Sequence, residues 1–128
     1  MFEYHGWVHL SETTCDAEDD EVQLQRIVAE AKALCLAKSD DWGIAEVKLL
    51  NGLYFVTLHG FRNHRQEWVV ELFSAVGALG RGSYGTLYIR DDEDPQLNNE
   101  LQYFVMRRGK ILRVAEEHLS PCMPILEE

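Results

Sequence analysis

The sequence has little positive charge. Its 128 residues include 12 lysines and arginines but 22 aspartates and glutamates, so the formal net charge is −10. Nucleic-acid backbones and anionic lipids attract basic surfaces, and this composition argues against either as a partner. A basic protein fits the charge better, because opposite charges speed association.

Long apolar runs and cysteines are also scarce. No apolar stretch approaches the roughly 20 residues that a membrane-spanning helix needs. The first residues lack the basic start and apolar run of a signal peptide. The odd number of cysteines (Cys15, Cys35 and Cys122) leaves at least one thiol free, and Cys35 is expected to be a small core residue. We therefore expect a cytoplasmic protein.

The rest of the sequence is typical of a folded protein. Its 128 residues, of which 46% are hydrophobic, predict one domain over residues 1–128. Alternating apolar and polar residues predict strands, and apolar residues at i, i+3, i+4 and i+7 predict helices. The predicted strands cover 2–10, 44–50, 53–60, 83–90, 101–107 and 110–116, and the predicted helices cover 21–38 and 63–79.

Two glycine-containing turns indicate how the strands pair. Asn51-Gly52 lies between two apolar runs and predicts a tight hairpin, as does Arg108-Gly109. Hairpins imply antiparallel strands, and two helices need a shared sheet on which to bury their apolar stripes. The order β-α-β-β-α-β-β-β therefore predicts an α+β fold, a mainly antiparallel sheet of about six strands with two helices packed on one face.

The helices and the end of the chain carry further signals. Asn63, with Gln66 three residues later, matches a capping box for the second helix. Trp42, in the loop after the first helix, is expected to pack on the core. Pro121 and Pro124 favour an extended tail. The predicted apolar stripe of the first helix comprises Leu24, Ile27, Val28, Ala31, Leu34 and Cys35.

Residues 83–94 join a strand to a run of acids. One face of this strand is predicted to carry Tyr84, Thr86, Tyr88 and Arg90. Adjacent carboxylates repel each other, so a protein that needed only a turn would gain nothing from four of them. We expect the whole run to reach the surface and to meet a positively charged partner. The run consists of Asp91, Asp92, Glu93 and Asp94.

The spacing of the histidines does not predict a metal site. His5 and His9 lie four residues apart on one predicted strand, about 13 Å, which is too far for two ligands of one zinc ion. His59 and His64 flank a loop and could approach each other. No metal ion and no cofactor is predicted.

Aromatic and charged residues favour binding over catalysis. Tyrosine and arginine are enriched at the hot spots of protein interfaces. We expect Trp7, Tyr84 and Tyr88 to anchor a partner, and Arg90 to form a charge-assisted bond to it. The alternative is that Trp7 and Tyr84 only cover the second face of the sheet.

One sequence pattern is spread over three segments: Tyr4-His5-Gly6-Trp7, Ser83 to Asp94, and Leu119-Ser120-Pro121-Cys122-Met123-Pro124. Together they resemble the immunity protein 7 family, and the resemblance extends from residue 3 to about residue 127. It implies a small cytoplasmic antitoxin of a bacterial polymorphic toxin system, without enzymatic activity, that binds and neutralises a cognate toxin domain. Thr86 departs from the family pattern, which has a bulkier apolar residue there. The net charge suits a basic toxin, such as a nuclease.

Two other functions stay open. One is a small metal-dependent hydrolase that uses His59 and His64. The other is a homo-oligomeric scaffold that pairs through an exposed sheet edge or an aromatic face. For an immunity protein we expect a monomer or a weak dimer.

Overall fold

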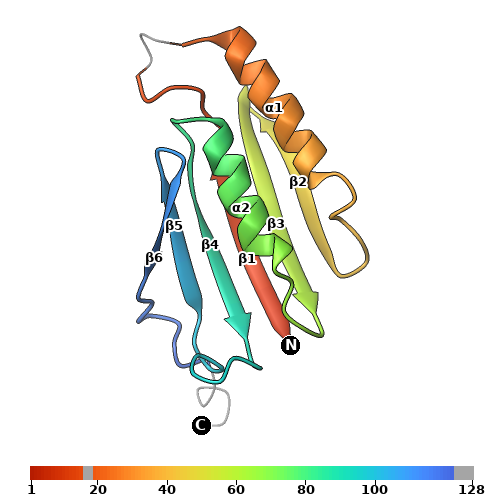
Figure 1. Cartoon of the computed structure of the whole chain (residues 1–128), viewed down its shortest axis with the longest axis vertical. Helices are drawn as coiled ribbons and strands as arrows, with labels where there is room; N and C mark the ends of the chain where they lie inside the picture. The colour runs from red at the N-terminus through yellow and green to blue at the C-terminus, as the bar shows by residue number, and fades with distance from the viewer. Residues whose placement is uncertain (16–18, 123–128) are drawn as a thin grey trace.

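The predicted order of elements is confirmed by a computed structural model, which describes residues 1–15 and 19–122. A six-stranded sheet has the strand order β2-β3-β1-β4-β5-β6, with antiparallel pairing between neighbours, so the α+β prediction is also confirmed (Figure 1). The elements are β1 (Phe2–His9), α1 (Glu21–Cys35), β2 (Gly43–Leu50), β3 (Leu53–Arg62), α2 (Trp68–Leu79), β4 (Tyr84–Asp91), β5 (Gln102–Arg107) and β6 (Lys110–Val114).

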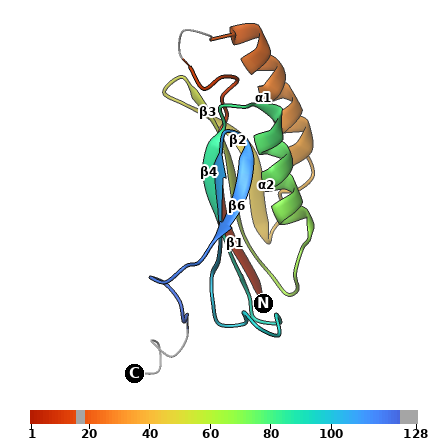
Figure 2. The ribbon, with the colours of Figure 1, turned by 60° about the vertical axis from the view of Figure 1, so that its left-hand side comes forward.

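Both helices lie on the same face of the sheet (Figure 2). We call this the covered face and the opposite one the open face. Successive side chains of a strand point to opposite faces, so each strand contributes to both. On β1 the side chains of Phe2, Tyr4 and Val8 are fully buried beneath the helices, whereas Trp7 is exposed on the open face.

The core lies between the helices and the covered face. Two residues that were expected in it, Leu34 and Trp42, are 38% and 58% exposed, so those predictions are wrong. Helix α1 lies near the edge of the sheet, over β2 and β3, and Trp42 leads into the edge strand β2 (Figure 1). No described helix is long and apolar enough to cross a membrane. The helices bury Ile27, Val28, Ala31 and Cys35 from α1, and Val69, Leu72, Phe73, Val76 and Gly77 from α2.

Both predicted hairpins are confirmed. Asn51 and Gly52 have φ values of 50° and 80°, and Arg108 and Gly109 have φ values of 50° and 73°. Positive φ at both central residues is what a type I′ turn requires, and its twist matches that of the flanking strands. The turns join β2 to β3 and β5 to β6.

The capping box predicted at Asn63 is wrong. Strand β3 continues to Arg62, which pairs with Phe2 of β1, so Asn63 belongs to the exit from the strand and α2 begins only at Trp68. Helix α1 ends at Cys35, three residues earlier than predicted. The predicted extended tail is described to residue 122, and residues 123–128 lie outside the described part of the chain.

Tyr4 links three elements of the covered face. Its ring fills the space above Gly43 and Gly60, which face each other on β2 and β3, and a Cβ atom at either glycine would collide with the Tyr4 side chain. The Arg62 Nε donates a hydrogen bond of 3.2 Å to the Tyr4 hydroxyl, and the Trp68 ring meets the Tyr4 ring edge-on at 5.8 Å. The two glycines therefore leave the space in which the Tyr4 side chain of β1 packs against β2, β3 and α2.

Candidate functional site

The open face carries aromatic rings that contact one another. The Trp7 ring meets the Tyr84 ring edge-on at a centroid distance of 5.9 Å. The His9 imidazole stacks on Phe55 at 5.1 Å and meets the Tyr84 ring at 4.8 Å. These residues belong to β3, β1 and β4, which are neighbours in the sheet. We call Trp7, His9, Phe55 and Tyr84 the aromatic cluster.

A second aromatic pair lies beside this cluster. The rings of Tyr88 on β4 and Tyr103 on β5 stack at 4.3 Å, with 10° between their planes. Burial, followed by the hydrogen bond with Tyr103, raises the pKa of the Tyr88 hydroxyl. The chain after β6 returns to this pair and borders a hollow of about 210 Å³, which is lined by Tyr88, Tyr103, Ala115, Glu116, Glu117 and His118.

The exposed area of these rings distinguishes the open face from the core. Trp7 is 40% exposed, Tyr84 48% and Phe61 54%, although all three lie on central strands of the sheet. The rings pack sideways against their neighbours and present their remaining surface to water. Contiguous exposed apolar surface of this kind marks interaction sites more often than scattered single residues do.

Arg90 adds a charged group to the same face. It lies opposite Glu3 in the pairing of β4 with β1. Its Nε atom is buried and has no hydrogen-bond partner among the residues that the structure describes. A buried donor without an acceptor is uncommon and costs free energy. Arg90 therefore differs from Arg62 and Arg65, whose guanidinium nitrogens have hydrogen-bond partners in the protein.

The expectation that all four acids reach the surface is wrong for Asp91, which is only 5% exposed. The alternation of β4 carries it to the covered face, two residues beyond Ile89. Its carboxylate accepts a hydrogen bond from the Glu93 backbone nitrogen at 3.1 Å and lies 3.5 Å from an Arg65 guanidinium nitrogen. Asp91 therefore stabilises the end of the strand and is not a surface contact.

The other three acids have partners within the protein. Asp92 pairs with the amino group of Met1, and Glu93 lies 2.6 Å from the His64 Nδ1. Asp94 accepts hydrogen bonds from the backbone nitrogens of Gln96 and Leu97, and these bonds hold its pKa below the usual value. The acidic turn lies at the end of the sheet that also holds the N-terminus, beyond the last residues of β4 (Figure 1).

The acidic turn and the aromatic cluster therefore lie in different places, although the sequence predicts that they share one surface. The open face of the strands carries two acids and four bases, which gives it a charge of +2 when the histidines are neutral. Because the net charge of the whole chain is −10, all other residues together carry −12. The acids are Glu3 and Glu46, and the bases are Lys48, Arg90, Arg107 and Lys110.

The two histidines proposed for a hydrolase have different partners. His64 pairs with Glu93 at the end of the sheet, whereas the His59 Nδ1 lies 3.3 Å from the His5 Nδ1 on the open face. Among the described residues, no three His, Cys, Asp or Glu side chains converge as a metal site. The spacing of His5 and His9 in the sequence gives no sign of the His5–His59 pair. His5 and His59 lie opposite each other only because of the register between β1 and β3.

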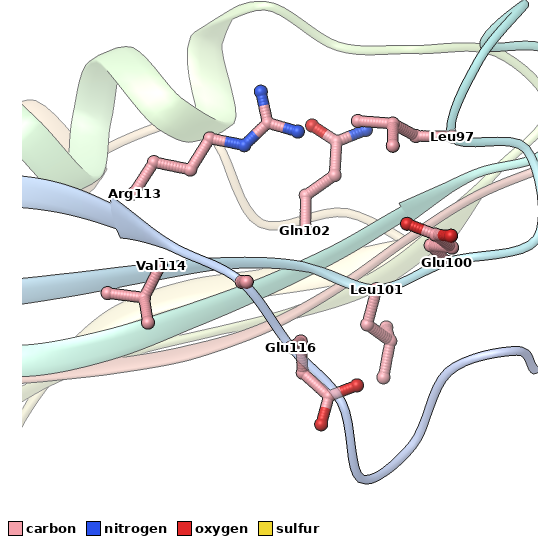
Figure 3. Close-up of a pocket in the computed structure, with 8 residues that line it drawn as sticks. Leu97, Glu100, Leu101, Gln102, Arg113, Val114 and Glu116 are labelled. Atoms are coloured by element: carbon pink, nitrogen blue, oxygen red, sulfur yellow. The ribbon is translucent and has the colours of Figure 1, made fainter.

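Cys35 and Glu116 are two further reactive side chains in the described part of the chain. Burial, assisted by Glu46, raises the pKa of the Cys35 thiol to about 11, which keeps it protonated at neutral pH. A crevice of about 420 Å³ lies between β5 and the end of β6, where Gln102 and Arg113 point to one side and Glu116 to the other (Figure 3). Glu116 already accepts hydrogen bonds from the Leu119 nitrogen and the Ser120 hydroxyl.

Comparisons with known proteins agree with a binding role. Searches of curated proteins and of solved structures find no match to this chain. The family model described as Immunity protein 7 matches residues 1–128, the whole chain. Membership implies an antitoxin that binds a cognate toxin protein, and it suggests a non-catalytic role. The chain therefore belongs to the immunity protein 7 family.

Proposed function

We propose that this immunity protein neutralises its toxin by holding it on the open face of the sheet. The observation that carries the proposal is the aromatic cluster, which stays half exposed on central strands while both helices occupy the other face. Trp7, Tyr84 and Tyr88 supply the rigid aromatic area that dominates binding energy at protein interfaces.

Arg90 orients the bound toxin on this surface. Its unpartnered Nε lies on the same face of β4 as Tyr84 and Tyr88. Arg90 as a whole is half-buried, and a toxin carboxylate or backbone carbonyl that reaches another nitrogen of its guanidinium would accept a charge-assisted hydrogen bond, which is stronger than a neutral one.

The acids act at longer range. Asp92, Glu93 and Asp94 lie at the end of the sheet that holds the N-terminus, and they are part of the −12 carried by the residues outside the open face. Such a field steers a basic toxin, for instance a nuclease, toward the protein and raises the association rate more than the final affinity. Neutralisation takes place in the cytoplasm, before the toxin reaches its substrate.

Co-expression with the toxin encoded beside this gene tests the function itself. Cells that carry the toxin should survive with the wild-type protein and die without it. Equal death in both cases would contradict an antitoxin role for this pair.

The location of the site is tested by calorimetry on the purified pair. Trp7→Ala and Tyr84→Ala should each weaken binding by about 2 kcal/mol, roughly 30-fold. Val22→Ala and Leu36→Ala are matched controls, because these apolar residues are 83% and 77% exposed in and beside α1. If the α1 variants lose affinity and the open-face variants do not, the toxin binds the helical layer.

A homo-oligomeric scaffold is the second candidate, and the exposed edges of the sheet favour it. Leu50 on β2 and Leu112 on β6 are 59% and 64% exposed. Lys48 and Lys110 lie on the same edge strands, and lysines there oppose edge-to-edge pairing. Light scattering from micromolar to millimolar concentration should give the mass of a monomer, and a stable dimer would favour the scaffold.

A further inference from the structure

We infer that His5 and His59 together form a binding site for a divalent transition-metal ion such as Zn²⁺. Their Nδ1 atoms lie 3.3 Å apart, on neighbouring strands of the open face. Two imidazole nitrogens bound to one tetrahedral zinc ion at about 2.0–2.1 Å lie about 3.3–3.4 Å apart. The backbone register therefore already sets the separation that two ligands of one ion require.

Glu3 prepares the donor atom of His5. Its Oε2 lies 2.8 Å from the His5 Nε2 and accepts a hydrogen bond from it. A proton on Nε2 leaves a lone pair on Nδ1, the atom that faces His59. A carboxylate on the far nitrogen of a ligating imidazole is the usual support of histidine–metal bonds, because it fixes both tautomer and ring orientation. Glu3 is a positioning residue in this arrangement.

The surroundings leave the site accessible. Phe61 meets the His5 ring edge-on at 5.8 Å, and the opposite neighbours of the pair are Tyr88 beside His5 and Ile44 beside His59. Arg90, which is positively charged, lies opposite Glu3 in the register. Among the described residues no third ligand converges on the pair, so two tetrahedral positions remain for water.

The donor set selects the class of metal. Imidazole nitrogen suits zinc, copper and nickel, whereas magnesium and calcium require oxygen ligands. Burial, followed by the charge of His5, lowers the pKa of His59, so this imidazole is available as a neutral ligand at pH 7.5. In the metal-free protein the two Nδ1 atoms are within hydrogen-bond distance of each other. With the His5 proton on Nε2, the proton between them belongs to the His59 Nδ1, and it moves to the His59 Nε2 when the ion binds.

The test is titration of ZnCl₂ into the full chain, with any polyhistidine tag removed, at pH 7.5. The wild type should bind one ion per chain, whereas His5→Ala and His59→Ala should lose binding. The double variant His64→Ala/His118→Ala is the control, because it removes two exposed histidines that lie outside the pair and should bind zinc as the wild type does. MgCl₂ should give no binding.

Two further measurements separate ligation from a structural effect. Glu3→Gln keeps both ligands and should weaken zinc binding about 10-fold or more. Zinc should raise the Tm of the wild type and of the control but not that of His59→Ala. NMR of the imidazole nitrogens should show the His5 and His59 Nδ1 signals moving together on addition of zinc. Wild-type binding that persists in His5→Ala and His59→Ala, or no zinc binding by the wild type, overturns the inference.

Discussion

The two faces of the sheet differ although the same strands build both. On β4, Leu87 and Ile89 are fully buried against the helices, while Tyr84, the first residue of the strand, is 48% exposed on the other side. Helices fill the covered face with aliphatic and aromatic contacts, and rings on the open face contact mainly each other. The folded core therefore lies on one face, and the proposed toxin site lies on the other.

The largest effect should come from the covered face. Phe73 of α2 is fully buried, and Phe73→Ala should lower the free energy of unfolding by about 3–5 kcal/mol, measured by urea denaturation. Tyr84→Ala on the open face should cost less than about 1 kcal/mol, because its ring already meets water. A similar decrease in the free energy of unfolding for both variants would contradict the view that the covered face supplies most of the stability.

A smaller loss is expected where Tyr4 packs on glycine. Gly60→Ala places a methyl group against the rigid Tyr4 ring and should destabilise the protein by about 1–3 kcal/mol. Thr57→Ala, on the open side of the same strand, should change stability by less than half as much. Thermal unfolding of the two variants gives the difference, and equal Tm values would show that the ring moves aside freely.

The acidic run offers a comparison between adjacent residues. Asp91→Ala removes a buried acceptor from the Glu93 nitrogen and from Arg65, and should lower the free energy of unfolding by about 1–3 kcal/mol. Asp92→Ala should change it by less than about 0.5 kcal/mol. The denaturation midpoints of both variants measure these changes. If Asp91→Ala leaves the free energy of unfolding unchanged, Asp91 does not stabilise the end of β4.

The smallest effect is the pH dependence contributed by the open face. Burial lowers the pKa of His59, so the unfolded chain takes up a proton more readily than the folded protein does. Its contribution to stability is complete above about pH 6.5 and is lost as the pH falls toward the lowered folded value. His59→Gln should flatten the curve of Tm against pH in this range, measured with EDTA present.

His64→Gln controls for the loss of a histidine as such, since His64 lies at the end of the sheet against Glu93. An equal flattening in both variants would mean that the effect does not arise on the open face.

Much of this fold follows from short-range patterns in the sequence. Asn51-Gly52 and Arg108-Gly109 predict their hairpins because few residues accept positive φ, and glycine does so without strain. The alternation on β4 predicts which side Tyr84, Tyr88 and Arg90 share. The acids were expected to break the strand pattern, but β4 continues to Asp91, and the alternation places this side chain on the buried side. The capping box at Asn63 failed because pairing with β1 extends β3 to Arg62.

The sequence by itself determined the order of the elements, the two hairpins and the residues that share a face of each strand, because these depend on local periodicity and on turn chemistry. Only the tertiary structure decided that both helices leave one face open, that the acidic turn lies apart from the aromatic cluster, and that His5 meets His59. Those outcomes depend on strand order and register, which join residues more than fifty positions apart and leave no local trace in the sequence.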